Sequence, residues 1–156
     1  MFSADRVGGW KNHYDRMLRW QRRAIDAGKD LPRTDFNDTL DIALAYFIWS
    51  HSLRDWIIKD GAITSAEIDN NLSRYPVWQI VRDVANRSKH LKLTQNPKDA
   101  DWFVRREYDS FSIVLEGRER HHINLFFDGK KHRLTDVILE SSEMWKEILL
   151  NQKMLG

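Results

Sequence analysis

Hydrophobic and polar positions in the first part of the chain repeat with the period of a helix. Between about Ala4 and Ala27 the repeating side chains are spaced by three and four residues, which places them on one helix face. This stripe consists of Trp10, Tyr14, Met17, Leu18, Gln21, Ala24 and Ile25. Asn12, Arg16, Arg19 and Arg23 fall on the opposite face, and Gly28 is expected to end the helix.

Three further helices are predicted before residue 92. The segment from about Asp35 to Lys59 is apolar on nearly every side, which is typical of a central helix covered on several faces. Thr64 followed by Glu67 forms a capping box that opens a short helix through about Leu72. Pro76 suits the first turn of another helix, which reaches about Leu91.

After Pro97 the hydrophobic period changes to two, which predicts strands. Phe111, Ile113 and Leu115 alternate with other residues in one segment, and Ile123, Leu125 and Phe127 do so in the next. Asp128-Gly129 is a strong signal for a tight hairpin turn, after which Lys130 to Leu134 would form a short strand. Thr135 and Asp136 are expected to cap a last helix that runs to about residue 152.

These elements predict an α+β fold that is mainly α. An antiparallel helical bundle over about residues 4–92 would be followed by a two- or three-stranded antiparallel β-meander over about 102–134. The final helix would cover about 135–152, and residues 1–156 would form a single domain.

Composition excludes several classes of protein. Hydrophobic residues make up 42% of the chain, too many for a disordered segment. The absence of Cys rules out disulfides, thiolate metal sites and Cys nucleophiles, and it favours a cytoplasmic location. The longest apolar stretch, residues 42–49, is too short to span a membrane. Seven Trp and a helix that is apolar almost all round predict a homodimer, with a helix face or the sheet at the interface.

Charge is unevenly distributed although the net charge is only +2. Eight basic and four acidic residues lie between Asp5 and Arg33, whereas two basic and seven acidic residues lie between Asp35 and Asp69. The balance is basic again, five to one, from Arg82 to Lys98. Arg16, Arg19, Arg23 and Lys89 are therefore candidate nucleic-acid-binding residues, with a solvated surface as the alternative.

The segment from Arg82 to His90 holds the most informative group of polar residues. Arg82, Asn86 and His90 project from one side of the predicted helix, opposite its core stripe, and Lys89 flanks them. An Arg can hold a phosphate, a His can move a proton near neutral pH, and an Asn can orient either one. The set is suited to metal-free phosphodiester cleavage. The alternative is an ordinary solvated helix face.

A second polar group interrupts the central helix at His51, Arg54 and Asp55. His51 projects within the apolar stripe, so its imidazole needs a hydrogen bond or a partner to offset desolvation. One interpretation is a polar bridge between helices. The other is that His51 and Arg54 open into a cleft shared with Arg82 and His90.

No metal or cofactor is predicted. His121, His122 and His132 lie on neighbouring strands, and Glu116 or Glu119 could supply a third ligand, but adjacent His121 and His122 point to opposite sheet faces. Surface histidines are the preferred interpretation. The chain also lacks Gly-rich phosphate loops, a Ser-centred nucleophile elbow and a recognisable carboxylate pair, which gives no support to nucleotide hydrolases, esterases or glycosidases.

The helical bundle with Arg82, a polar neighbour and His90 on one helix resembles the HEPN superfamily, although the spacing from Arg to His is longer here. Ala85–His90 also resembles a stretch of small bacterial proteins without an assigned activity. The HEPN resemblance implies a dimeric, metal-independent RNase of a toxin–antitoxin or antiviral system. It would assign phosphate binding to Arg82, the polar neighbour role to Asp83 and proton transfer to His90.

These observations lead to two functional hypotheses. The first is an RNA-directed protein, a metal-independent endoribonuclease of a bacterial defence or toxin system, with Arg82 and His90 central and Asn86, His51, Arg54 and Asp83 in support. The second is a non-catalytic helical module that binds a protein partner. Convergence of His51, Arg54, Arg82 and His90 on one cleft would favour the first hypothesis.

Overall fold

The computed structural model describes residues 7–29, 35–90, 96–108 and 121–155. These residues form five helices and one sheet, so the expected mainly helical α+β class is confirmed. In chain order the elements are α2 (Trp10–Lys29), α3 (Phe36–Lys59), α4 (Ser65–Leu72), α5 (Pro76–Lys89), β1 (Phe103–Tyr108), β2 (His121–Phe127), β3 (Lys130–Arg133) and α7 (Leu134–Asn151).

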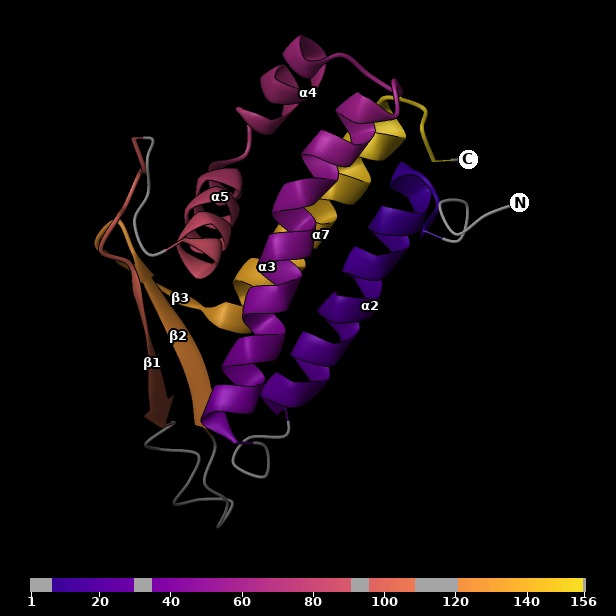
Figure 1. The fold of residues 1–156 in the computed structure, drawn as a ribbon. Coiled ribbons are helices and arrows are strands. Elements are labelled where there is room, and N and C mark those ends of the chain that lie inside the picture. Colours follow the sequence, from indigo (N-terminus) through magenta and orange to yellow (C-terminus); the bar gives the residue numbers. More distant parts are fainter. Residues whose placement is uncertain (1–6, 30–34, 91–95, 109–120, 156) are drawn as a thin grey trace.

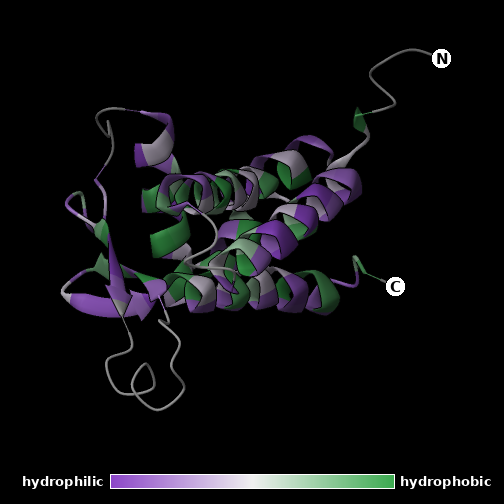
Figure 2. Cartoon of the chain, turned by 90° about the horizontal axis from the view of Figure 1, so that it is seen from below, coloured by the Kyte–Doolittle hydropathy of each residue, from purple (hydrophilic) through white to green (hydrophobic). Residues whose placement is uncertain are grey.

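The long helices pack around α3 (Figure 1). Helices α2 and α5 lie on opposite sides of α3 and run against it, while α7 lies behind it and runs in the same direction. The helices turn their hydrophobic positions toward one another (Figure 2). Buried side chains of all five helices and of β2 form one hydrophobic cluster. None of the described helices is both long and apolar enough to cross a membrane.

Hydrogen bonds tie α3 to α7 inside this core. Tyr46 and Trp145 are fully buried, and each places a polar atom near a serine of the other helix. The Tyr46 hydroxyl lies 2.6 Å from Ser141 Oγ, and Trp145 Nε1 donates to Ser50 Oγ at 3.1 Å. The small serines let the two helices approach closely while satisfying the polar atoms of the large rings.

Helix α2 differs from the expected element at its end. It continues through Gly28 to Lys29, so the prediction that Gly28 stops the helix is wrong. A Cβ at Gly28 would lie 2.8 Å from Thr135 Cγ2, so the glycine allows close packing against the start of α7. At the other end, the backbone N–H of Trp10 donates to Asp60 Oδ2 at 3.0 Å, so a carboxylate after α3 stabilises the beginning of α2.

Local sequence signals predicted the positions of the next three helices closely. Helix α3 begins at Phe36 and ends at Lys59, close to the expected bounds. Thr64 Oγ1 accepts a hydrogen bond from Glu67 N at 3.2 Å, so the Thr64 cap of α4 is confirmed. Pro76 lies in the first turn of α5, as expected, but the helix ends at Lys89 rather than near Leu91.

The sheet is a three-stranded antiparallel meander in the order β1-β2-β3, with Val104 opposite Leu125 and Leu125 opposite His132. The hairpin at Asp128-Gly129 is confirmed, and both residues have positive φ, 50° and 75°. The expected strand at Phe111, Ile113 and Leu115 lies outside the described residues. Strand β1 was not predicted, because its sequence FVRREY lacks a clear apolar alternation.

The start of the last helix also differs from the prediction. Strand β3 ends at Arg133 and α7 begins at the next residue, with Arg133 as its N-cap. Thr135 and Asp136 therefore lie inside the first turn and do not cap the helix. The strand leads into the helix without a loop, and Leu134, the first residue of the helix, is buried in the core.

Candidate functional site

The contact between α3 and α5 holds most of the polar residues selected from the sequence. Its centre is His51, which is half-buried and stacks on the Trp78 indole with ring centroids 5.4 Å apart. Trp78 in turn meets the buried Trp145 edge to face at 5.7 Å, so the imidazole rests on a rigid aromatic support. His51 Nδ1 is buried and has no hydrogen-bond partner in the described part of the chain.

The surroundings of His51 keep its imidazole neutral. Burial lowers the pKa of His51 to about 4, and the positive charge of Lys89 adds to this effect. Arg54 and Arg82 lower the pKa further, and only Asp55 opposes them. A neutral imidazole between cations can accept a proton, and the cations can attract an anion. A phosphate bound among them would raise the pKa of His51.

Arg82 lies at the solvent edge of this cluster. Its side chain is 36% exposed, and its Nε donates to Asp83 Oδ1 at 3.1 Å. The guanidinium is thus anchored at Nε and still reaches the surface. This arrangement is compatible with the phosphate-binding role expected of Arg82.

Asp83 is buried and acts as a structural anchor. Besides Arg82, its carboxylate accepts the backbone N–H of Asp99 at 2.8 Å through Oδ2. Asp99 Oδ2 in turn accepts the backbone N–H of Asp128 in the β2–β3 turn at 2.8 Å. Two carboxylates therefore fasten the sheet to α5. These contacts account for the burial of Asp83 without a direct role in chemistry.

Arg54 forms a polar bridge between helices. Its guanidinium donates to both carboxylate oxygens of Asp69 on α4, at 2.6 and 2.9 Å, and to Asp55 Oδ1 at 2.8 Å. The contacts of Arg54 therefore agree with the interpretation of this group as a polar bridge between helices. Its charge still contributes to the environment of His51.

The predicted row Arg82, Asn86 and His90 does not continue along one helix. His90 is the C-cap of α5 and has extended backbone angles, φ −133° and ψ 138°, so helical projection no longer applies to it. Its side chain is exposed, whereas Asn86 is half-buried. From α5, the positive charges of Lys89 and Arg82 act on His51.

Trp78 is the part of the cluster that was missed. Trp78, Arg82 and Lys89 are separated by four and seven residues, which places them on one side of α5. That spacing was a usable signal. Because Trp78 was assigned to neither the core stripe nor the polar group, the row that faces His51 was not recognised.

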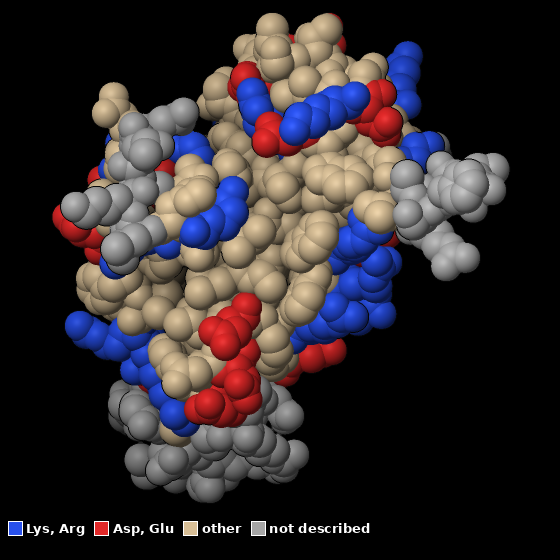
Figure 3. All heavy atoms as spheres, in the orientation of Figure 1, with Lys and Arg blue, Asp and Glu red and all other residues tan. Residues whose placement is uncertain are grey.

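The two groups of basic residues flank a common face (Figure 3). Lys and Arg side chains gather over α2 on one side and over α5 on the other, and mostly uncharged side chains of α3 lie between them. On α2, Arg16 lies over the Trp49 ring at 5.9 Å and Arg23 over the Trp20 ring at 4.7 Å. Arg19 is exposed. The basic faces do not merge into one stripe, because α3 separates them.

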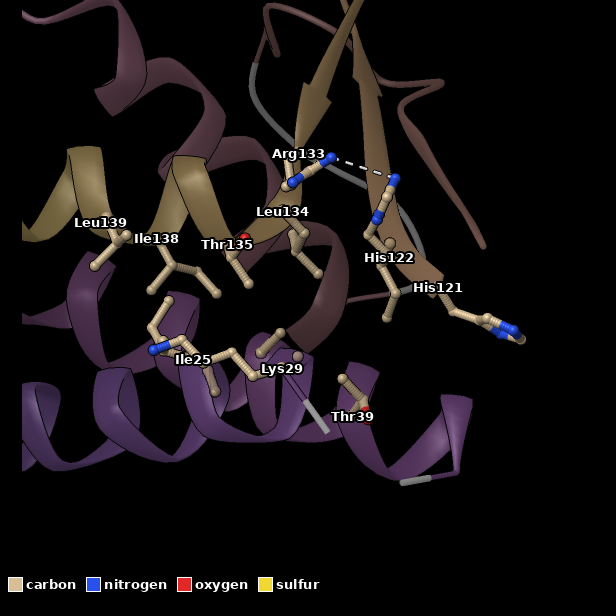
Figure 4. A pocket seen from close by; sticks show the side chains of 14 residues that line it. Ile25, Lys29, Thr39, His121, His122, Arg133, Leu134, Thr135, Ile138 and Leu139 are labelled. Carbon is tan, nitrogen blue, oxygen red and sulfur yellow. Dashed lines mark hydrogen bonds between the residues drawn. The ribbon is translucent and has the colours of Figure 1, made fainter. Parts of the chain in front are cut away.

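His121 and His122 of β2 each lie against an arginine. Arg106 Nε donates to His121 Nδ1 at 2.7 Å, and Arg133 Nη2 lies 3.3 Å from His122 Nε2. His121 and His122 point in different directions (Figure 4). Glu116 and Glu119 lie outside the described residues. Among the residues described, no three His, Asp or Glu side chains come together as a metal site would require.

Comparisons with known proteins add no functional assignment. No protein-family model, no curated protein and no solved structure matches the chain. Functional inference therefore depends on the residues and their geometry.

Proposed function

We propose that this chain is an RNA-directed protein that cleaves RNA without a metal ion at the α3–α5 contact. The observation that carries the proposal is the stacking of His51 of α3 on Trp78 of α5, beside the side chain of Arg82. Burial lowers the pKa of His51, and the positive charges of Lys89, Arg54 and Arg82 add to this effect. An imidazole base beside cations is the chemistry that cleavage through a ribose 2′-hydroxyl requires.

In this mechanism each group has one task. Arg82 and Lys89 hold the phosphate, and the His51 imidazole accepts the proton of the 2′-hydroxyl. The 2′-oxygen forms a bond to phosphorus while the bond from phosphorus to the 5′-oxygen breaks, which leaves a 2′,3′-cyclic phosphate. The 5′-oxygen takes up a proton from water as it leaves. The bound phosphate raises the pKa of His51 and so makes the imidazole a stronger base in the complex.

The test is cleavage of single-stranded RNA in the presence of EDTA. The variants His51→Asn, Arg82→Gln and Lys89→Gln should each lower the rate, with a loss of about a hundredfold or more for His51→Asn. Arg74→Gln and Lys146→Gln remove one charge at exposed positions elsewhere and should leave the rate unchanged. RNA with a single 2′-deoxy nucleotide at the cleaved position should resist cleavage. Wild-type rates in His51→Asn and Arg82→Gln, or intact RNA with the wild-type protein, would refute the cleavage mechanism.

RNA binding is tested separately from cleavage. The basic residues that flank α3 should contact phosphates, so the affinity for single-stranded RNA should fall steeply with salt. A variant with Arg16→Glu, Arg19→Glu and Arg23→Glu should bind more weakly than one with Arg74→Glu, Lys146→Glu and Lys153→Glu, which has the same net charge. Equal affinities of these two variants would exclude α2 as an RNA-binding surface.

The second candidate function is a protein-interaction module that pairs with a second copy of the chain. Its support is the outward side of α3, where Leu44 and Ile48 are only half-buried. Exposed Asp38 and Asp41 lie toward one end of this side, and basic residues of α2 and α5 lie along its flanks. Apolar groups together with charges of both signs are suited to pairing with an identical surface.

Light scattering at high micromolar concentration tests this homodimer. The wild-type protein should have the mass of a dimer, and Ile48→Glu should shift it to a monomer. Leu150→Glu, which adds the same charge at an exposed position of α7, should remain dimeric. A monomeric wild-type protein, or a dimeric Ile48→Glu variant, would exclude this interface.

A further inference from the structure

A cavity of about 320 Å³ lies where the end of α2, the beginning of α3, the start of β2 and the start of α7 meet. Its size is at the lower end of the range of small-molecule sites, roughly 300–1,000 Å³. Thr39, in its wall, precedes His51 on α3 by twelve residues, a rise of about 18 Å along a helix. The cavity is thus separate from the α3–α5 contact, and a ligand in it would bind independently of any RNA cleavage at that contact.

The walls of the cavity are mainly apolar (Figure 4). The contributing side chains include Ala24, Ile25, Ala43, Leu134, Ile138 and Leu139. Leu139 is 43% exposed although it is a large hydrophobic residue in the wall. An apolar ligand body would bury this surface and gain its transfer free energy.

The polar groups of the cavity favour an anion. Arg133 and His122 reach toward one another on one side, and Lys29 extends from α2 along another wall (Figure 4). Within the described part of the chain, 14 residues line the cavity and none of them is acidic. A carboxylate or similar head group would thus meet cationic side chains without an opposing charge among the described residues of the wall.

The beginning of α7 adds to this preference. Leu134 and Thr135, the first residues of the helix, line the cavity. The N-cap is Arg133, whose side chain has only donors and cannot accept hydrogen bonds from the first-turn N–H groups. These N–H groups and the helix dipole attract negative charge. Asp136 is the acidic residue of this turn, and its side chain is exposed to solvent.

We propose that this cavity binds a small amphipathic organic anion, a carboxylate with a short apolar body. The head group contacts Arg133, His122 and the first turn of α7, and the body lies against Ile25, Ile138 and Leu139.

Isothermal titration with octanoate as the probe tests the proposal. Octanoate should bind saturably, whereas octylamine and octan-1-ol, which have the same chain without the negative charge, should bind at least about tenfold more weakly. No saturable binding of octanoate, or equal binding of all three compounds, would overturn the proposal.

Variants with matched controls locate the site. Leu139→Trp fills the cavity from its exposed wall and Arg133→Gln removes the cation, so each should weaken octanoate binding about tenfold. Leu150→Trp and Lys130→Gln make the same changes at exposed positions outside the cavity and should bind like the wild-type protein. Unchanged affinity in Leu139→Trp, or equal losses in Leu139→Trp and Leu150→Trp, would place the binding elsewhere.

Discussion

The imidazole of His51 stacks on the indole of Trp78, with an angle of 25° between the ring planes. This contact joins α3 to α5 and fixes the position of the imidazole. It also removes the ring from water, which is the largest cause of the lowered pKa of His51. The same contact therefore contributes to both the stability of the fold and the chemistry of the candidate site.

Stability should decrease in mild acid because of His51. The pKa of His51 is about 4 in the folded protein, against 6.5 in the unfolded chain. Between these values the unfolded state binds more protons, so the free energy of unfolding falls as the pH decreases from 6.5 to 4, by up to about 3 kcal/mol. The pKa of His13 is also lowered by burial, which acts in the same direction. Urea unfolding of the wild type and of His51→Phe at several pH values measures the effect. The difference between the two curves should change across this window, and parallel curves would contradict the assignment.

Asp83→Ala should destabilise the protein substantially. The substitution removes the acceptor of the Asp99 N–H and the partner of Arg82 from a buried position. The loss should be about 2–3 kcal/mol in the free energy of unfolding. Asp101→Ala, at an exposed position two residues after Asp99, should change stability by less than about 0.5 kcal/mol. Chemical denaturation measures both, and equal effects would mean that Asp83 does not anchor the sheet.

The ion pair of Arg54 and Asp69 should contribute little despite its bidentate geometry. Both side chains are partly exposed, 30% and 51%, so water screens the interaction. A double-mutant cycle with Arg54→Met and Asp69→Asn should give a coupling energy of about 0.5 kcal/mol, which decreases in high salt. A coupling above about 2 kcal/mol would show that the pair is desolvated in solution.

Ser50→Ala should lower the free energy of unfolding by more than the removal of an exposed hydroxyl does. The Trp145 N–H would lose its acceptor in the core, where both residues are fully buried. We expect a loss of about 1–2 kcal/mol in the free energy of unfolding. Ser73→Ala, whose hydroxyl bonds to Asn70 O at an exposed position, serves as the control. Thermal unfolding that shows the same loss in both variants would contradict the expected difference.

Local sequence signals determined most of the helices and one hairpin. The apolar stripe of α2, the Thr64 cap of α4, Pro76 in α5 and the Asp128-Gly129 turn each depend on residues near one another in the chain. Such signals act through periodicity, capping and backbone angles, which a short segment contains in full. The sequence also indicated His51 and Arg54, which interrupt the apolar central helix, and Arg82, which lies on the polar side of its helix.

The tertiary structure alone decided which of these groups meet. Trp78 packs against His51, and Arg82 and Lys89 lie on the same side of α5 as Trp78. His90 does not belong to this side, because the helix ends before it. Gly28 did not stop α2, because its missing side chain is needed for contact with Thr135, more than a hundred residues away. Strand β1 is paired with β2 although its own pattern does not indicate a strand. In each case packing between distant segments outweighed the local preference, and periodicity within one segment carries no record of such contacts.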